Sequence, residues 1–473
     1  MRHWLAVCLL LSFIGVPLAA GVPRRDPLRT FFDDQRRFQM LSGATRSVLK
    51  LRFATPAAAR KAPTAAKPAS PDSVRGAASR GGRSSALTLS NTAVNDPSAD
   101  TGVQDTQSSS ALVLGSGSNA IAAFNDSGSW IPGVNDHFTG FSRSADGGAS
   151  WTDAGTLPAS TGGDAGDPVL ARDETSGAVF LSTLNFDTLD TIQFFRSSDD
   201  GVSFSSAVNA TPGLSGLGDL LDKEWIAVDN FQGSGQGNVY LVLRDFTQAG
   251  PGSPRDGILF FRSTDGGSTW GPSGGLLIAG SGNFNVQGAF VTVGPDHAVY
   301  VFWLDQSAGA GTPNVIEMRK SADLGVSFGG AVTVATLSSS NIRTNGDLGL
   351  QGGFRTNSFP QAAVNPVSGN LYVVYNDVAS DQDAADIYLR QSLDGGATWG
   401  APVSVSDDTG GADQFHPSLA VTPDGTALFV AFYDRRLDPA NSLIDRFGAI
   451  ATISGSTVTL LPNFRITSGS FPV

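Results

Sequence analysis

The chain has 473 residues, of which 57 are glycine, and only 16% of its residues are charged. Residues 1–88 contain 15 Lys and Arg against 4 Asp and Glu, whereas the remainder contains 16 against 39, so a basic N-terminal part precedes a strongly acidic one within the net charge of −12. An acidic domain of this kind repels nucleic acid and anionic membranes, so nucleic acid is not expected as a partner.

The first twenty residues have the pattern of a secretory signal peptide. Arg2 and His3 precede the apolar run Trp4–Leu18, and Ala19-Ala20 follows it. The run is too short for a membrane span, so we expect a secreted or cell-surface protein without a transmembrane segment in the mature chain. Cys8, the single cysteine, lies in this run, so the mature protein would have neither a disulfide nor a thiol nucleophile.

Residues 21–88 form a basic segment rich in Ala, Pro and Ser. Ala54–Ser85 has the composition of a disordered linker, whereas Leu28–Phe53 could form one basic amphipathic helix. The segment could be a pro-region, a surface tether, a partner for the acidic domain or a solvated linker.

Residues 89–473 are predicted to form one all-β domain, since short apolar runs alternate there with Gly, Asp and Ser. A strand, turn, strand pattern recurs, most clearly at Pro360–Val364 with Leu371–Asp377 and at Pro417–Val421 with Leu428–Asp434. Related units start near Ser110, Pro168, Trp225 and Gly288. Six such units predict a six-bladed β-propeller of four-stranded antiparallel blades.

Five units continue into a motif S-x-D-x-G-x-x-(W/F). Its Asp can accept hydrogen bonds from the following backbone N–H groups, its Gly permits a tight turn, and its aromatic residue can bury a large apolar face. The motif therefore predicts a β-turn without a chemical role. The copies are Ser144–Trp151, Ser197–Phe204, Ser263–Trp270, Ser321–Phe328 and Ser392–Trp399.

The sixth unit has no copy of the motif. Its outer strands are expected from Gly448–Ser454 and Thr457–Leu461, or one strand could come from Ala86–Ala93 and close the ring.

The repeated motif resembles the Asp-box, or bacterial neuraminidase repeat, of the sialidase superfamily, since all five copies match at Ser, Asp, Gly and the aromatic residue. The resemblance implies the same six-bladed propeller with Asp-box turns. Asp-boxes also occur in other glycosidases and in non-catalytic propellers. The resemblance therefore implies recognition of carbohydrate more directly than a particular reaction.

One face of the propeller would carry the ends of the second strands. Acids recur there: Asp126, Asp245, Asp305, Asp377 and Asp434. Each could cap the N–H groups of the following loop, or together they could form a ring of carboxylates that binds a cation or a sugar. Asp377, Asp381, Asp383 and Asp386 form a cluster of hard oxygen ligands on one loop, which makes calcium the candidate cofactor, with a solvated acidic loop without a metal as the alternative.

Candidate catalytic residues lie on the same face. Tyr433, Asp434, Arg435 and Arg436 form the densest mixed-charge cluster, and Glu224, Arg244 and Arg355 are the further candidates. Arginine pairs with a carboxylate such as that of sialic acid, and a Tyr or Asp beside it could act as nucleophile or acid. Alternatively, these charges could form an ion-pair network that joins the loops.

The chain departs from the sialidase pattern, however. The first blade begins at Asp105–Ser109 and lacks the Arg-Ile-Pro motif that supplies one arginine of the family's carboxylate clamp. The sequence therefore predicts a secreted, monomeric propeller that recognises extracellular carbohydrate. An exo-α-sialidase-like glycoside hydrolase acting on terminal sugars is the alternative, and other chemistry such as a polysaccharide lyase also stays open.

Overall fold

The computed structural model describes residues 27–53, 91–96, 107–128, 136–185, 190–214, 219–246, 256–280, 286–307, 312–338, 347–378 and 384–472. The predicted signal peptide Met1–Ala20 and the linker Ala54–Ser85 lie outside these residues. Among the described helices, none is long and apolar enough to cross a membrane.

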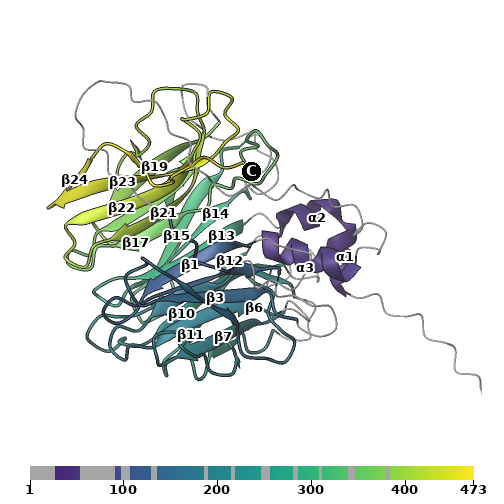
Figure 1. Cartoon of the computed structure of the whole chain (residues 1–473). Coiled ribbons are helices and arrows are strands. Elements are labelled where there is room, and N and C mark those ends of the chain that lie inside the picture. The colour runs from purple at the N-terminus through teal and green to yellow at the C-terminus, as the bar shows by residue number, and fades with distance from the viewer. Residues whose placement is uncertain are drawn as a thin grey trace, which may run out of the picture.

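Six antiparallel sheets form the main domain (Figure 1), and each is built from strands that follow one another in the sequence. Within the described residues five of them have four strands and the sixth has a short fifth strand, and they are the blades of the predicted six-bladed propeller. Blade 1 contains β1 (Gln107–Leu114), β2 (Ala120–Asp126), β3 (Thr139–Ser144) and β4 (Thr152–Thr156). Blade 2 contains β5 (Val169–Arg172), β6 (Val179–Leu184), β7 (Ile192–Ser197) and β8 (Val208–Asn209). Blade 3 contains β9 (Leu221–Val228), β10 (Val239–Asp245), β11 (Gly257–Ser263) and β12 (Gly271–Gly280).

The second half of the ring repeats this order. Blade 4 contains β13 (Val286–Val293), β14 (Val299–Asp305), β15 (Val315–Ser321) and β16 (Val332–Thr336). Blade 5 contains β17 (Gln361–Val364), β18 (Leu371–Asp377), β19 (Asp386–Ser392) and β20 (Val403–Ser404). Blade 6 contains β21 (Gln414–Val421), β22 (Ala427–Asp434), β23 (Asp445–Ser454) and β24 (Thr457–Leu460), and the short β25 (Phe464–Arg465) also pairs with β23.

Alternating side chains of the middle strands join neighbouring blades. In β10, Leu241 and Leu243 pack into the core shared with blade 2, whereas Tyr240 and Val242 pack into the core shared with blade 4. Both faces of the strand are therefore buried, which explains why it is apolar without interruption.

The join between blades 6 and 1 is different. Leu112 of β1 is 62% exposed and Phe429 of β22 is 38% exposed. Asn91 exchanges hydrogen bonds with Ile466 and Ser468 behind blade 6, and the N–H of Asp96 donates to Asp153 of blade 1. Blade 6 is thus completed by its own C-terminal strands, as one of the two alternatives predicted, and residues 91–96 connect its outer edge to blade 1.

The five repeated motifs form the turns between the third and fourth strands of blades 1 to 5. In the first turn, Ser144 Oγ donates to Asp146 Oδ1 (2.8 Å), and both the N–H and the hydroxyl of Ser150 donate to the same carboxylate. These hydrogen bonds lower the pKa of Asp146 to about 2. Equivalent bonds hold the other four turns, so the predicted structural role of the motif is confirmed.

In blades 2 to 5, the aromatic residue of the motif also contacts the preceding blade. Phe204 packs edge-on against Phe141, with ring centroids 5.1 Å apart, and Trp270 packs edge-on against Phe194 at 5.0 Å. The approach is so close that a Cβ added to the motif glycine Gly267, whose φ is +85°, would lie 2.0 Å from Phe194. The motif therefore fixes both a turn and the spacing between two blades.

Truncation of this contact should destabilise the ring. Phe204 is 8% exposed, so we expect Phe204→Ala to lower the free energy of unfolding by about 3–5 kcal/mol through lost burial and the cavity left behind. Val202→Ala in the same turn is the control, since Val202 is 56% exposed and its truncation should change stability by less than about 0.5 kcal/mol. Urea unfolding measures both, and equal losses would contradict a blade-joining role for Phe204.

The basic N-terminal segment folds into three short helices instead of the single helix predicted. They are α1 (Pro27–Asp33), α2 (Gln35–Met40) and α3 (Gly43–Phe53), which lie together at one side of the sheets (Figure 1). The predicted helix is interrupted at Ser42, because the hydroxyl of Ser42 accepts the N–H of Thr45 (3.1 Å) and caps the start of α3. Leu28, Leu41, Val48 and Leu49 are buried in the core that blades 2 and 3 share, so this part of the segment is docked on the propeller.

Candidate functional site in the axial cavity

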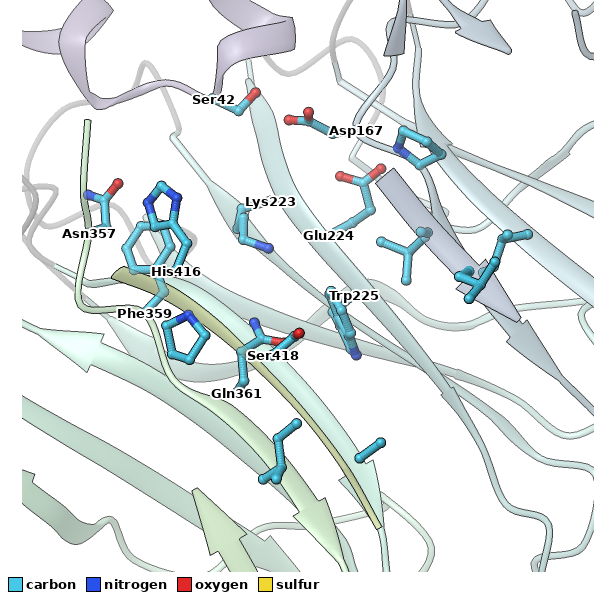
Figure 2. Close-up of a pocket in the computed structure, with 18 of the residues that line it drawn as sticks. Ser42, Asp167, Lys223, Glu224, Trp225, Asn357, Phe359, Gln361, His416 and Ser418 are labelled. Atoms are coloured by element: carbon cyan, nitrogen blue, oxygen red, sulfur yellow. The ribbon is translucent and has the colours of Figure 1, made fainter. Parts of the chain in front are cut away.

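A cavity of about 740 Å³ runs along the propeller axis, and residues of the innermost strands line it. In the view of Figure 2, Asp167 lies beside Ser42 of the N-terminal segment, Glu224 and Lys223 lie below them, and Trp225 lies below Glu224. His416 lies to one side of Lys223, near Asn357 and Phe359. Leu112 and Phe429 also line it, so the cavity extends toward the join between blades 1 and 6.

Bulges in the innermost strands present several of these side chains. In blade 3, Asp222 pairs with Arg244 and Trp225 pairs with Val242, so Lys223 and Glu224 together oppose one residue. The extra residue turns the strand, and both Lys223 and Glu224 line the cavity although consecutive strand residues normally point to opposite faces.

The first residue of the bulge has left-handed backbone geometry in two blades, and a residue at the start of blade 2 does so too. The φ angles are 53° for Lys223, 48° for His416 and 54° for Asp167. Such angles raise the conformational energy of residues other than glycine, and residues that have them cluster at active sites and ligand-binding sites. The fold therefore uses an unfavourable backbone shape to direct a lysine, a histidine and a carboxylate into one cavity.

Glu224 is a buried carboxyl group without a hydrogen-bond donor. It is 1% exposed, and neither carboxylate oxygen has a hydrogen-bond partner among the described residues. Burial, followed by the negative charge of Asp167, raises the pKa of Glu224 well above its usual value. The protonated form is therefore favoured, which is the form that can donate a proton or a hydrogen bond.

Asp167 supplies the second carboxylate. Its side chain accepts a hydrogen bond from Asn125 Nδ2 (3.1 Å), and its own N–H donates to Asn125 Oδ1 (2.5 Å). Asn125 thus fixes both backbone and side chain of Asp167. The cavity holds two carboxyl groups in unlike surroundings, one buried without a donor and one held by an amide.

Lys223 adds a cation close to these acids. Its ammonium lies 5.2 Å from the centre of the Trp225 ring. Burial lowers the pKa of Lys223, and the surrounding carboxylates of Asp167, Glu224 and Asp222 oppose that effect. Trp225 itself packs on Phe290 with ring centroids 4.5 Å apart, so the indole is held in place.

His416 faces the cavity from blade 6. Its backbone N–H donates to Asn376 Oδ1 (3.2 Å), which positions the bulge. Enclosure in the cavity, together with the positive charges of Arg355 and Arg446, lowers the pKa of His416 to about 4. The imidazole is therefore neutral at pH 7 and can both donate and accept hydrogen bonds.

Two arginines complete the set. Arg446 comes from β23, lies 4.4 Å from the centre of the Tyr433 ring and donates to Ser418 Oγ (3.0 Å). Arg355 comes from the stretch before blade 5 and donates to the carbonyl of Leu41 (2.5 Å). Both line the cavity, so three cationic side chains face it in a domain whose overall charge is strongly negative.

Among the residues predicted from sequence, Glu224 and Arg355 line this cavity and the others are outside its lining. Arg244 is fully buried and pairs with Asp256 (2.6 Å), and its guanidinium packs over Phe246. These contacts join the end of β10 to the start of β11.

The cluster at Tyr433–Arg436 is an ion-pair network in the structure. Arg436 pairs with Asp434 (2.7 Å) and with Asp407 (2.5 Å), and Arg435 pairs with Asp413 (3.5 Å). Burial raises the pKa of Asp434 to about 6 despite the charge of Arg436. The catalytic roles predicted for these residues stay predictions.

The acids at the ends of the second strands cap the loops that follow. Asp126 accepts the N–H of Gly128 (3.1 Å), and Asp305 accepts the N–H of Ser307 (2.7 Å). Asp377 and Asp434 also accept backbone N–H groups. The capping interpretation is therefore confirmed at these four positions.

The predicted calcium loop is described only in part. Asp377 accepts the N–H of Ser338 (2.6 Å) and Asp386 accepts the hydroxyl of Ser406 (2.7 Å), whereas Asp381 and Asp383 lie outside the described residues. Elsewhere in the described chain, no group of three or more His, Cys, Asp or Glu could hold a metal ion. Calcium binding by this loop stays a prediction.

Sequence reasoning missed Asp167 and Arg446. Asp167 stands just before Pro168, where a unit was predicted to start, so its place at the beginning of an innermost strand was the available signal. Arg446 lies on a third strand, and nothing in its sequence context indicates that its side chain reaches the axis.

No family model and no curated protein matches the sequence. Solved structures with a similar fold include an α-L-arabinanase of Penicillium chrysogenum complexed with arabinobiose, at 16% identity and a TM-score of 0.49 over 73% of this chain and 93% of that one. A polysaccharide lyase, an ulvan lyase, gives 11% identity and a TM-score of 0.49 over 78% and 84% of the two chains. A Hadza microbial sialidase gives 17% identity and a TM-score of 0.41 over 76% and 66%. Likeness at this level carries no argument about activity.

Proposed function

We propose that the protein is exported and binds extracellular glycan in its axial cavity. The observation that carries this proposal is the mixture of groups facing one cavity: three cations, two carboxyl groups, a neutral imidazole and an indole. Sugars have hydroxyl groups that pair with carboxylates and amides, and C–H faces that pack on aromatic rings. A concave site with a few convergent polar groups on an apolar wall suits such a ligand.

The excess of cations favours sugars that carry an acidic group. Lys223, Arg355 and Arg446 line the cavity while the domain as a whole is acidic, so the cavity can attract an anion that the outer surface repels. Arginine pairs with a carboxylate through two parallel N–H donors. The resemblance of the five turns to Asp-boxes agrees with a carbohydrate ligand.

Removal of the lysine charge should test this selectivity. We expect Lys223→Met to weaken binding of methyl β-D-glucuronide or methyl α-N-acetylneuraminide by about tenfold, which is about 1.4 kcal/mol. Binding of a neutral methyl β-D-glucoside should change little, since the methionine retains the apolar stem. Calorimetric titration of the purified chain measures all three.

Lys320→Met is the matched control, because Lys320 pairs with Asp296 and is not among the residues that line the cavity. It should leave the affinities unchanged. If the wild-type chain bound no glycoside of this set, or if Lys223→Met weakened charged and neutral sugars equally, selective recognition of acidic glycans in this cavity would be wrong.

Hydrolysis of a terminal sugar is the second candidate function. It is favoured by one specific observation, namely the two carboxyl groups of Glu224 and Asp167 in unlike surroundings at one end of the cavity (Figure 2). Glycosidases commonly use one protonated and one ionised carboxyl group in this way. In this proposal Glu224 protonates the leaving oxygen and Asp167 acts as base or nucleophile.

A further inference from the structure

We propose that the helical segment α1–α3 is an internal occupant of the axial site, and that it covers a subsite of Asp222 and Arg355 that accepts an acidic sugar once the segment leaves. The proposal rests on the proposed function, because it names the ligand class and the regulation of the same cavity. Three independent sets of contacts support it.

The first set joins α3 to Asp222. The backbone N–H of Ser42 donates to Asp222 Oδ2 (2.7 Å), and the hydroxyl of Thr45 donates to Asp222 Oδ1 (3.0 Å). Both donors come from the start of α3, where free N–H groups favour a negative charge. Asp222 is fully buried in this arrangement, and burial followed by the charge of Asp167 raises its pKa. A pair of sugar hydroxyls could replace these two donors.

The second set joins α2 to Arg355. The guanidinium donates to the carbonyl of Leu41 (2.5 Å) and, at 3.5 Å, to the carbonyl of Gln39. The carbonyl oxygens of the segment accept these hydrogen bonds, and the carboxylates of Asp222, Asp167 and Asp347 also act on the charge of Arg355. A sugar carboxylate in place of the two carbonyls would accept charge-assisted hydrogen bonds, which are stronger. The segment thus gives donors to an acid and acceptors to a base, which is the pairing that a sugar with hydroxyls beside a carboxylate would make.

The third set is apolar. Leu28, Leu41, Val48 and Leu49 are each at most 5% exposed and share a core with strands of blades 2 and 3. The helices have only 7, 6 and 11 residues, and helices shorter than about 12 residues are marginal in water without tertiary support. Their structure therefore depends on docking, and an undocked segment should lose it.

Docking and binding compete under this proposal. While the segment covers Asp222 and Arg355, an acidic sugar reaches only the part of the cavity that opens elsewhere, and the apparent affinity is reduced by the fraction of molecules in the closed state. A basic segment on an acidic domain also contributes general attraction to the closed state, which salt would weaken.

A charge introduced under α3 tests the proposal in the full-length chain. We expect Leu49→Asp to undock the segment, so trypsin should cut at its arginines and lysines about tenfold faster or more. The affinity for methyl β-D-glucuronide should rise about tenfold or more, since the closed state no longer competes. Gln35→Asp is the matched control, because Gln35 is exposed on α2 and the substitution adds the same single charge without removing a trypsin site, and both readouts should stay close to the wild-type level.

Two further variants test whether the effects depend on the contacts with Asp222 and on the charge of Arg355. Thr45→Val removes one donor to Asp222 without adding a charge, and it should shift both readouts in the same direction to a smaller extent. In the Leu49→Asp background, Arg355→Gln should abolish the gain for the glucuronide and leave methyl β-D-glucoside unaffected. Thr45→Val also provides the test if Leu49→Asp does not fold.

The outcomes separate this proposal from the proposed function. Faster cleavage without a gain in glucuronide affinity would overturn the occupied subsite while leaving glycan binding intact. Wild-type cleavage rates in both Leu49→Asp and Thr45→Val would show that the segment does not undock and would overturn the regulatory role. Absence of binding to any glycoside in any variant would sink the proposed function, and the subsite with it, whatever the cleavage rates.

Discussion

Replacement of Glu224 by glutamine is expected to lower turnover of a susceptible glycoside by about 10²–10⁴-fold, the usual contribution of a general acid. The carboxyl group is 1% exposed, accepts no hydrogen bond from another described residue and lies near Asp167 at one end of the cavity (Figure 2). Glutamine keeps the shape of the glutamate side chain but has no acidic proton to donate. Since the pKa of Glu224 is raised, wild-type activity should fall as the pH rises through that pKa, and the variant should lose this limb of the profile.

The stability of the same variant distinguishes a catalytic from a structural role. A buried carboxyl group without a partner destabilises the fold, so Glu224→Gln should have a Tm equal to or above that of the wild type while its activity is lost. Glu174→Gln is the control, because Glu174 is exposed and pairs with Arg172 at the turn after β5. The assay uses a panel of aryl glycosides that includes the α-sialoside. Wild-type turnover of none of them would exclude the exo-acting hydrolase and leave binding as the function.

The six blades could be predicted because their signals are local and repeated. A middle strand such as Val299–Asp305 is apolar on both faces, and the motif turn that begins at Ser321 has its donors and acceptor within five residues. The structure of each unit can therefore be predicted from its own residues, and the repetition of the pattern along the chain supports the prediction. The exception was Leu28–Phe53, where a local pattern suggested one helix and the capping hydroxyl of Ser42 divides it.

The site was harder to predict because its geometry depends on bulges and on distant segments. The sequence does not indicate that Lys223 and His416 have left-handed backbone conformations, because these conformations belong to bulges in the strand pairing of the folded blades. Ser42 and Asp222 are 180 positions apart, and only the fold brings them together. A dense run of charges, as in Tyr433–Arg436, indicates a site by composition, whereas in the structure Arg436 pairs with Asp434 of the same run and Arg435 pairs with Asp413.

The placement of Arg435 predicts a large effect on stability. Its guanidinium is fully buried, pairs with Asp413 (3.5 Å), donates to the carbonyl of Gln351 (2.9 Å) and packs on Phe354 and Phe415. Arg435→Ala would leave Asp413 as a buried charge that has lost its counter-ion, so we expect the free energy of unfolding to fall by about 3–5 kcal/mol in urea.

Comparison with Arg355→Ala separates a carboxylate clamp from a structural pair. Arg355 is half-buried at the cavity, so its truncation should change glycan affinity far more than stability. The double variant Arg435→Met with Asp413→Leu should recover much of the stability lost in Arg435→Ala, because apolar side chains can replace a buried ion pair. If Arg435→Ala instead unfolded like the wild type but lost binding or turnover, Arg435 would belong to the substrate clamp that the sequence predicts, and the ion pair with Asp413 would serve to orient it.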